Sequence, residues 1–391
     1  MITVSEAFSI LQNNIPTPLQ ENCSLREARK KILSQSILSP INMPPFRQSA
    51  MDGYVVCLHE SLSYQIIGEI KAGDAESFVL QPGQAVKIFT GAPVPDTAQV
   101  MIPIERVTVQ QSELLLQSKP QIGDNIRPIG EQIKIGDVAL EKGTLLDAAA
   151  IGFLAALGLT AVPVYKKPSV GIVVTGNELL APGLPLTYGK VYESNGVMLE
   201  AALLDAFYQE VTLYSVKDNF ESTKNILQTA ISQHVVVLVS GGISVGDYDF
   251  VAQALQELQV KTLFHKVNQK PGKPLFAGKV NEKMIFALPG NPAACLTCFY
   301  VYVLPTLQRI SGQLTQYEAL NSLPLEHCFS VNNSRSQFLK AKVTNGKVAI
   351  LSHQASSMLN TFSTANALVY VGEGDYKLKE NELVTVYWLK N

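Results

Sequence analysis

The spacing of apolar and polar residues changes several times along the chain. Near the N-terminus, the capping box Thr3–Glu6 predicts a first helix, and a similar box at Ser24–Glu27 predicts a second. Short alternating runs separated by Gly, Pro and Asp then predict a small β domain over 40–137. Asp147 and Gly158 supply the start and stop signals of a further helix. The N-terminal helical part is therefore expected to be discontinuous, with the β domain inserted into it.

From Pro168 onwards, apolar runs alternate with helix-like stretches. This alternation is typical of βαβ units and predicts a mostly parallel sheet. Strands are expected at 170–174, 211–216, 235–240, 262–267 and 284–288, and helices at 195–208, 219–233, 249–259 and 292–311. After Pro324, alternating runs predict a last β domain. The predicted fold class is multidomain, α/β plus β.

Composition and charge exclude several classes of protein. The 31 Lys and Arg against 33 Asp and Glu give a net charge of −2, which argues against general nucleic-acid binding. Five Cys in a chain of 391 residues do not make a disulfide scaffold and fit a reducing compartment. The N-terminus has no signal-peptide pattern, and the Ala-rich stretch 148–164 is broken by Gly and Pro. We expect a cytoplasmic protein without a nucleic-acid or membrane partner.

Three Gly-rich polar loops follow predicted strands, and ligands of open α/β sheets bind beyond the carboxyl ends of the strands. Glycines there let backbone amides face an anion, and a helix N-terminus favours negative charge. Ordinary βα turns, which also favour Gly, are the alternative. The loops are Thr175–Glu178, Ser240–Asp249 and Leu288–Pro292.

A lysine-rich stretch strengthens the case for an anionic ligand. Six Lys and one acidic residue lie between 261 and 283, and Lys270 and Lys273 flank a Pro-Gly turn. Two ammonium groups on a stiff turn lose less side-chain freedom on binding an anion than groups on a mobile loop. We favour an anion site for this pair, whereas the other four Lys fit a solvated strand edge.

Acidic residues at the same strand ends are candidate metal ligands. Mg²⁺ beside a phosphate takes one or two carboxylates and keeps several waters, which suits Glu178. For Asp218, Asp247 and Asp249 the alternative is an N-cap of the following helix. Cys295 and Cys298 form half a zinc motif without a second pair, so two buried small side chains are the preferred interpretation.

Seven segments in order resemble the molybdopterin molybdenumtransferase family, whose animal counterpart is the E-domain of gephyrin. Each segment alone is common, but seven with matching gaps over nearly the whole chain are specific. They are Ser49–Tyr54, Phe89–Pro93, Gly130–Glu131, Thr175–Leu179, Ser240–Asp249, Lys270–Pro274 and Leu288–Pro292.

The resemblance implies four domains and an elongated homodimer, in which the first β domain of the partner subunit completes the pterin site. The expected parts are a discontinuous N-terminal linker and dimerisation domain (1–44 and 140–167), an inserted β domain (45–139), a three-layer α/β molybdopterin-binding domain (168–316) and a C-terminal β-barrel-like domain (317–391).

The resemblance also implies a reaction. Adenylylated molybdopterin and molybdate enter, the adenylate is hydrolysed with Mg²⁺ as cofactor, AMP leaves, and molybdenum is inserted. A molybdopterin adenylyltransferase is a further candidate partner. The expected catalytic residues are Asp52, Glu178, Asp249, Lys270 and Lys273. Those expected to bind substrate are Thr90, Ser240, Gly241, Gly242, Ser244, Pro289, Gly290, Asn291, Pro292, Arg335 and Ser356, and those expected to hold Mg²⁺ are Glu178, Asp218 and Asp249.

One position departs from the family. Gln132 follows Gly130–Glu131, where the family usually has Asp, and its side chain carries no charge. A non-catalytic pterin-binding carrier or scaffold is therefore one alternative. A pterin adenylyltransferase is another, because a related α/β domain performs that step, although the flanking β domains favour the insertion enzyme.

Overall fold

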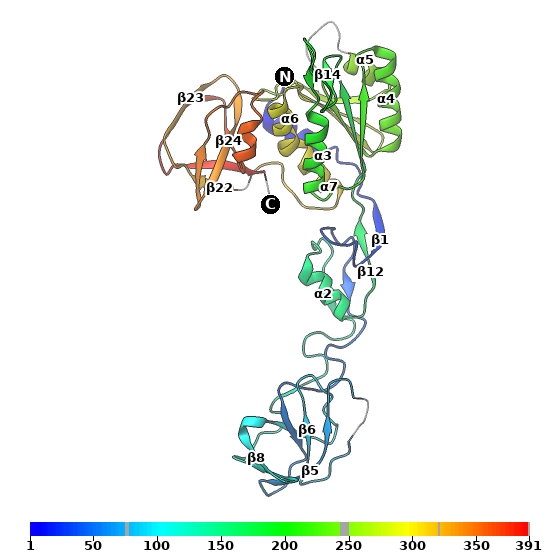
Figure 1. Ribbon diagram of the computed structural model, residues 1–391, viewed down its shortest axis with the longest axis vertical. Helices are drawn as coiled ribbons and strands as arrows, with labels where there is room; N and C mark the ends of the chain where they lie inside the picture. The colour runs from blue at the N-terminus through cyan, green and yellow to red at the C-terminus, as the bar shows by residue number, and fades with distance from the viewer. Residues whose placement is uncertain (75–77, 243–249, 320, 390–391) are drawn as a thin grey trace. The chain divides into compact units, whose positions relative to one another are not determined.

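The computed structural model describes residues 1–74, 78–242, 250–319 and 321–389 (Figure 1). The chain divides into two compact units. The α/β unit comprises Met1–Glu21, Lys30–Ile32 and Val164–Asn391, and the β unit comprises Asn22–Arg29 and Leu33–Pro163. The four domain boundaries expected from the sequence stay predictions.

A six-stranded sheet forms the centre of the α/β unit. Its first four strands are parallel, whereas β20 is antiparallel to both of its neighbours. As a result β18 points the same way as the parallel strands, and the loops that leave β13, β17, β21 and β18 emerge at one edge. The strand order is β16 (Val211–Val216), β13 (Val170–Thr175), β17 (Val236–Ser240), β21 (Lys283–Leu288), β20 (Phe276–Val280) and β18 (Lys261–His265).

Helices cover both faces of this sheet, which gives three layers (Figure 1). One face carries α4 (Phe220–Gln233) and α5 (Phe250–Glu257). The other carries α1 (Val4–Gln12), α3 (Asn195–Asp205), α6 (Pro292–Cys298) and α7 (Leu304–Ile310). Both faces are buried, which explains the continuous apolar runs of the central strands. The expected fold class is confirmed.

A π-helical turn, Phe299–Val303, joins α6 to α7. Pro305 lies at the start of α7 and has no amide hydrogen, so it cannot donate an α-helical bond to the carbonyl of Val301. By length and composition Pro292–Ile310 is, among the described residues, the one helical run that could cross a membrane, but 78% of its most apolar window is buried in the fold. It is the core helix of this unit, and its buried Cys295 and Cys298 agree with the sequence interpretation.

The C-terminal residues of the α/β unit form a second sheet, and the lysine-rich loop is part of it. β19 (Gln269–Lys270) lies in the connection between β18 and β20, yet it pairs in parallel with β24. The sheet order is β19, β24 (Ser336–Thr344), β26 (Ala367–Val371), β28 (Leu383–Trp388) and β22 (Asn321–Pro324), with β25 (Lys347–Ile350) beside β24. β23 (Phe329–Asn333) pairs with β27 (Gly374–Leu378), and α8 spans Asn360–Thr364.

The β unit contains the sheet expected before Asp137. Its order is β7 (Val100–Pro103), β4 (Gly53–Val56), β6 (Gln84–Ile88), β5 (Ser63–Ile70), β9 (Glu113–Leu116) and β8 (Val107–Gln110). The short pairs are β2 (Ile37–Leu38) with β11 (Val138–Leu140), and β3 (Gln48–Ser49) with β10 (Ile126–Arg127). The expected helix α2 (Ala148–Ala156) is capped by Asp147 and followed by Gly158 at φ 82°.

The helix predicted to begin at Ser24 is wrong. The hydroxyl of Ser24 does donate to Glu27 Oε2 (2.9 Å), as in a capping box, but residues 25–27 form a turn after β1 (Gln20–Ser24). β1 pairs with β12 (Ala161–Tyr165), and the Leu25 amide continues this pairing by donating to the Thr160 carbonyl (3.0 Å). Strand pairing with the returning chain overrides the local helix signal.

Candidate functional site

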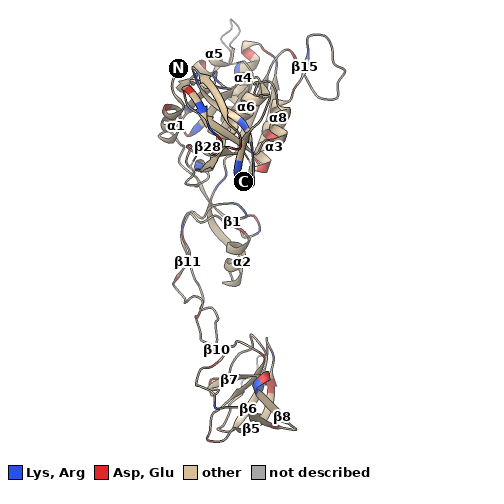
Figure 2. Ribbon diagram, turned by 90° about the vertical axis from the view of Figure 1, so that its left-hand side faces the viewer, with Lys and Arg blue, Asp and Glu red and all other residues tan. Residues whose placement is uncertain are grey.

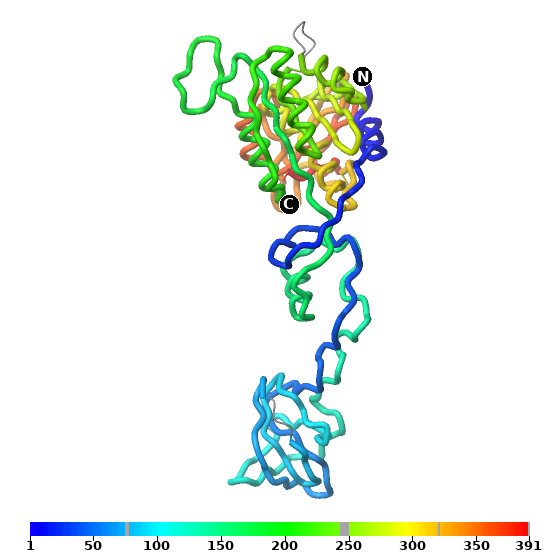
Figure 3. Tube along the Cα trace, turned by 90° about the vertical axis from the view of Figure 1, so that its right-hand side faces the viewer, coloured from blue at the N-terminus to red at the C-terminus, as the bar shows by residue number. Residues whose placement is uncertain are grey.

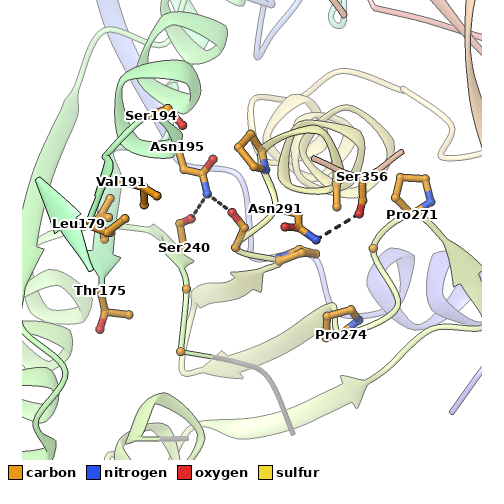
Figure 4. Close-up of a pocket in the computed structure, with 18 of the residues that line it drawn as sticks. Thr175, Leu179, Val191, Ser194, Asn195, Ser240, Pro271, Pro274, Asn291 and Ser356 are labelled. Carbon is orange, nitrogen blue, oxygen red and sulfur yellow. Dashed lines mark hydrogen bonds between the residues drawn. The ribbon is translucent and has the colours of Figure 1, made fainter. Parts of the chain in front are cut away.

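A cavity of about 840 Å³ lies at the sheet edge where the loops after β13, β17, β21 and β18 meet the C-terminal β domain (Figure 4). Small-molecule sites commonly have volumes of this order. Twelve of the expected site residues line it: Glu178, Ser240, Gly241, Gly242, Lys270, Lys273, Pro289, Gly290, Asn291, Pro292, Arg335 and Ser356. One cavity therefore gathers loops that are more than 150 residues apart in the sequence.

Other expected residues are placed differently. Ser244, Asp247 and Asp249 fall within 243–249, outside the described residues. Asp218 does not line the cavity. Its carboxylate accepts hydrogen bonds from the Thr175 hydroxyl and the Asn177 amide, so it ties the loop after β16 to the loop after β13.

Asp52 and Thr90 belong to the β unit, where they form a pair. Asp52 Oδ1 accepts hydrogen bonds from the amide (2.8 Å) and the hydroxyl (2.7 Å) of Thr90. These bonds, the backbone one first, hold the pKa of Asp52 below its ordinary value. The result is an exposed carboxylate that is kept ionised.

The basic end of the cavity consists of Lys270, Lys273 and Arg335. None of these three cations forms an ion pair with a described residue. Between the two Lys, Gly272 has φ +90°, and an added Cβ would lie 2.5 Å from Cys298 Sγ. The turn therefore requires Gly, and it presents uncompensated positive charge to the cavity.

Two asparagines organise the middle of the cavity (Figure 4). Asn195 is 8% exposed, and its Nδ2 donates to Ser240 Oγ (2.8 Å) and to the Gly290 carbonyl (2.8 Å). It thereby connects the start of α3 to the ends of β17 and β21. Asn291 Nδ2 donates to Ser356 Oγ (3.1 Å) and so joins the α/β loop to the C-terminal β domain.

The first amides of α6 are already occupied. Ala293 and Ala294 both donate to the Ser356 carbonyl, at 3.1 and 3.3 Å, and Pro292 has no amide hydrogen. In many α/β proteins a ligand anion binds at such a helix start. Here the backbone of the C-terminal domain, at Ser356, occupies that position instead. In this arrangement the amides of Ala293 and Ala294 are not available to an anion, whereas the side chains of the basic end are.

The acidic end of the cavity consists of Glu178 and Glu193. The short strands β14 (Leu179–Leu180) and β15 (Val191–Tyr192) pair in parallel, with Glu178 just before β14 and Glu193 just after β15. Glu193 Oε1 accepts a hydrogen bond from the Gly196 amide (2.7 Å), whereas the Glu178 carboxylate has no hydrogen-bond partner among the described residues. The segment between β14 and β15 extends outward from the α/β domain (Figures 2 and 3).

The two ends lie on opposite sides of the cavity. Thr175, Leu179 and Val191 are on one side in Figure 4, and Pro271, Pro274 and Ser356 are on the other. Sequence reasoning missed Glu193 and Asn195, because no Gly-rich motif marks them. A usable signal was their position just before a predicted helix of the parallel sheet.

The donor set restricts which metal the cavity could hold. Within the described ranges, no group of three or more His, Cys, Asp or Glu side chains is placed to bind a metal ion. The cavity lining contains neither His nor Cys, so its donors are oxygen atoms. Such a set fits a hard ion that takes one or two carboxylates and completes its shell with water and phosphate, as Mg²⁺ does.

Three family models match the chain. The one described as "MoeA N-terminal region (domain I and II)" matches residues 2–158. "Probable molybdopterin binding domain" matches residues 171–309, and "MoeA C-terminal region (domain IV)" matches residues 323–389. The cavity lies on residues matched by the second and third models.

Individual proteins are similar over the full length. The molybdopterin molybdenumtransferase of Haemophilus influenzae is 32% identical, over 99% of this chain and 98% of the relative. That of Staphylococcus epidermidis is 30% identical, over 98% and 95%. The crystal structure of the molybdopterin biosynthesis MoeA protein of Pyrococcus horikoshii OT3 has a TM-score of 0.81 and 28% identity, and the match covers 99% of this chain and all of that one.

Proposed function

This chain belongs to the molybdopterin molybdenumtransferase family of enzymes, which insert molybdenum into molybdopterin, and we propose that its substrates are adenylylated molybdopterin and molybdate. AMP is the product that leaves. The observation that carries this proposal is the separation of charge within one cavity, with unpaired cations at one end and carboxylates at the other. A doubly charged oxyanion and a metal-bound phosphate need these two environments.

The basic end is the proposed molybdate site. Lys270 and Lys273 act as point charges on the turn, and the planar guanidinium of Arg335 offers several donors to a tetrahedral oxyanion. Ser356, which also lines the cavity, has a hydroxyl that accepts from Asn291 and can donate to the same ion. Together these groups would replace the hydration shell of molybdate beside the pterin.

The acidic end is the proposed Mg²⁺ site. Glu178 is the first choice for a ligand because its carboxylate is not engaged by described neighbours, and Glu193 retains one oxygen. Asp218 and Asp249 remain the ligands suggested by the family motif. When bound, Mg²⁺ would neutralise charge on the adenylate phosphate during hydrolysis.

The chain is proposed to work as a homodimer whose partner subunit supplies Asp52 and Thr90. The role proposed for Asp52 is supported by the Thr90 hydrogen bonds, which go to its Oδ1 and leave Oδ2 without a hydrogen bond from any described residue. This oxygen would orient a water molecule toward the adenylate phosphorus. We further propose a cytoplasmic location and a molybdopterin adenylyltransferase as the supplier of the substrate.

The test is reconstitution from purified components. The chain is incubated with adenylylated molybdopterin, molybdate and Mg²⁺, and AMP release is measured beside the activation of a cofactor-free molybdenum enzyme. We expect both to depend on molybdate and Mg²⁺. If neither AMP nor active cofactor forms, the proposed function is wrong, and pterin binding without turnover would support the carrier alternative instead.

A further inference from the structure

A fully buried amide lies beneath the lysine turn. Gln269 is 0% exposed, and its Nε2 donates to the carbonyls of Pro271 (3.1 Å) and Gly272 (3.3 Å), the two residues between Lys270 and Lys273. Both carbonyls are therefore bound from the interior, while the two ammonium groups face the cavity. Burial of an amide costs free energy unless its hydrogen bonds are made, so this arrangement has few alternatives.

The other end of the amide is held by the π-helical turn. Tyr302 is also 0% exposed, and its hydroxyl donates to Gln269 Oε1. Burial raises the pKa of Tyr302 well above its ordinary value, so the phenol stays a donor at any physiological pH. Because Oε1 must face this donor, the amide hydrogens must face the turn.

We propose that Gln269 and Tyr302 are positioning residues that set the spacing and direction of Lys270 and Lys273, and thereby the affinity of the enzyme for the molybdate oxyanion. The inference rests on the proposed function, since it concerns the same basic end. Neither residue touches the oxyanion. Each acts through the turn, and the effect of removing either should be confined to the oxyanion.

Loss of the amide changes the conformation of the turn but removes neither ammonium group. In Gln269→Leu, the half-buried Pro271 carbonyl and the buried Tyr302 hydroxyl lose the partner that they have here, and the Gly272 carbonyl keeps only the long bond from Cys298 Sγ (3.9 Å), so the turn must shift to find others. Small displacements of positioning groups lower reaction rates by up to about 100-fold. Tyr302→Phe removes a single oxygen and keeps the ring contact with Phe8, at 5.3 Å between centroids, so its effect should be smaller.

The experiment measures KM for molybdate and kcat separately in the AMP-release reaction. For Gln269→Leu we expect KM to rise about tenfold and kcat at saturating molybdate to change less than about twofold; for Tyr302→Phe, KM should rise about threefold. The matched control is Thr297→Val, which removes a buried hydroxyl on α6 bonded only to the Ala293 carbonyl (2.8 Å). An unchanged KM in both variants, or an equal rise in the control, would overturn the inference.

A double-variant cycle tests whether the amide acts through the lysine. In a Lys273→Ala background, Gln269→Leu should raise KM further by less than about twofold; a full additional tenfold rise would contradict the inference. If Gln269→Leu does not fold, Tyr302→Phe replaces it in the same double-variant cycle with Lys273→Ala. Absence of turnover in the unsubstituted chain contradicts the proposed function, whereas normal turnover with unchanged KM in the variants contradicts only the positioning role.

Discussion

The two ends of the cavity are held in very different ways. The backbone of the basic end pairs with β24 on one side, and Val267 just before it bridges to Ile2 on the other. The side-chain amide of Gln269 then holds the turn from the protein interior by its hydrogen bonds to the turn carbonyls. At the acidic end, two-residue strands hold Glu178 and Glu193, and Glu178 has no hydrogen-bond partner among the described residues.

This difference agrees with the ligands proposed for the two ends. Molybdate is small and rigid, so a site built before it arrives would avoid ordering costs on binding. A nucleotide phosphate with its metal is larger and brings its own water molecules, so an end where Glu193 is bonded through one oxygen and Glu178 has no partner among the described residues could be arranged around it. The exposed Leu184 and Tyr188 in the segment between β14 and β15 show that the acidic end also borders an open surface.

The largest expected effect comes from removing a cation of the rigid end. Lys273→Ala should lower kcat/KM for molybdate about 500-fold, because preorganised charge is lost where nothing can replace it. Steady-state kinetics with varied molybdate measure this. Lys261→Ala, an exposed lysine of β18 outside the cavity, is the control and should be near wild type. Equal effects in the two variants would show that the oxyanion binds elsewhere.

The next effect concerns the β unit. Asp52→Ala should lower turnover about 100-fold without loss of the proposed dimer, because the carboxylate would orient water and, among the described residues, makes its side-chain bonds with Thr90 alone. AMP release and light scattering measure the two quantities. If Asp52→Ala and Glu178→Ala both retain full turnover, the site has been placed wrongly.

A smaller effect, which depends on the Mg²⁺ concentration, is expected at the acidic end. Glu178→Ala should lower turnover about 50-fold at low Mg²⁺ and recover in part at high Mg²⁺, because a single lost ligand weakens metal affinity. A titration of rate against Mg²⁺ concentration in both proteins checks this. Lys273→Ala serves as the contrast, since excess Mg²⁺ should not rescue it; rescue of both would remove the distinction between the two ends.

The smallest effect is on pH dependence. Thr90→Val removes the hydroxyl hydrogen bond to Asp52 and keeps the backbone amide bond, which is the larger cause of the lowered pKa, so this pKa should rise only part of the way toward its ordinary value of 3.8. A lowered carboxyl pKa contributes stability above pH 3.8 that is lost as the pH falls through the folded-state value. The variant should therefore lose part of this acid-dependent contribution. An NMR titration of the Asp52 carboxyl measures it, and an unchanged pKa would contradict the assigned cause.

The sequence predicted the fold where burial makes a strong pattern. β13 and β17 are buried at every position because both faces are covered, and they carry no polar side chain before their last residues, Thr175 and Ser240. β20 was not predicted, because Gly278 and Lys279 interrupt its apolar pattern. It also pairs antiparallel with its neighbours, so the alternation of strands and helices that identifies parallel strands does not mark it. The prediction of a helix beginning at Ser24 was wrong because a capping box indicates only a local conformational preference.

The site was predictable where residues close together in the sequence form it. The Gly-rich loops and the Lys-Pro-Gly-Lys turn have a spacing that can be recognised in the sequence before the fold is known. Gln269 was not predictable, and the position of Asn195 at the start of a predicted helix could not identify its partners, since the roles of both residues arise from bonds to Gly290 and Pro271 that exist only after folding. A buried amide is indistinguishable in sequence from an exposed one.

The π-helical turn Phe299–Val303 makes the length of this segment a constraint of its own. Deleting one residue there would let the helix close into a regular α-helix, and every side chain before the deletion would rotate by about 100° relative to those after it. Tyr302 would then no longer face Gln269. Natural relatives should therefore show substitutions in this turn more often than insertions or deletions, even though none of its residues lines the cavity.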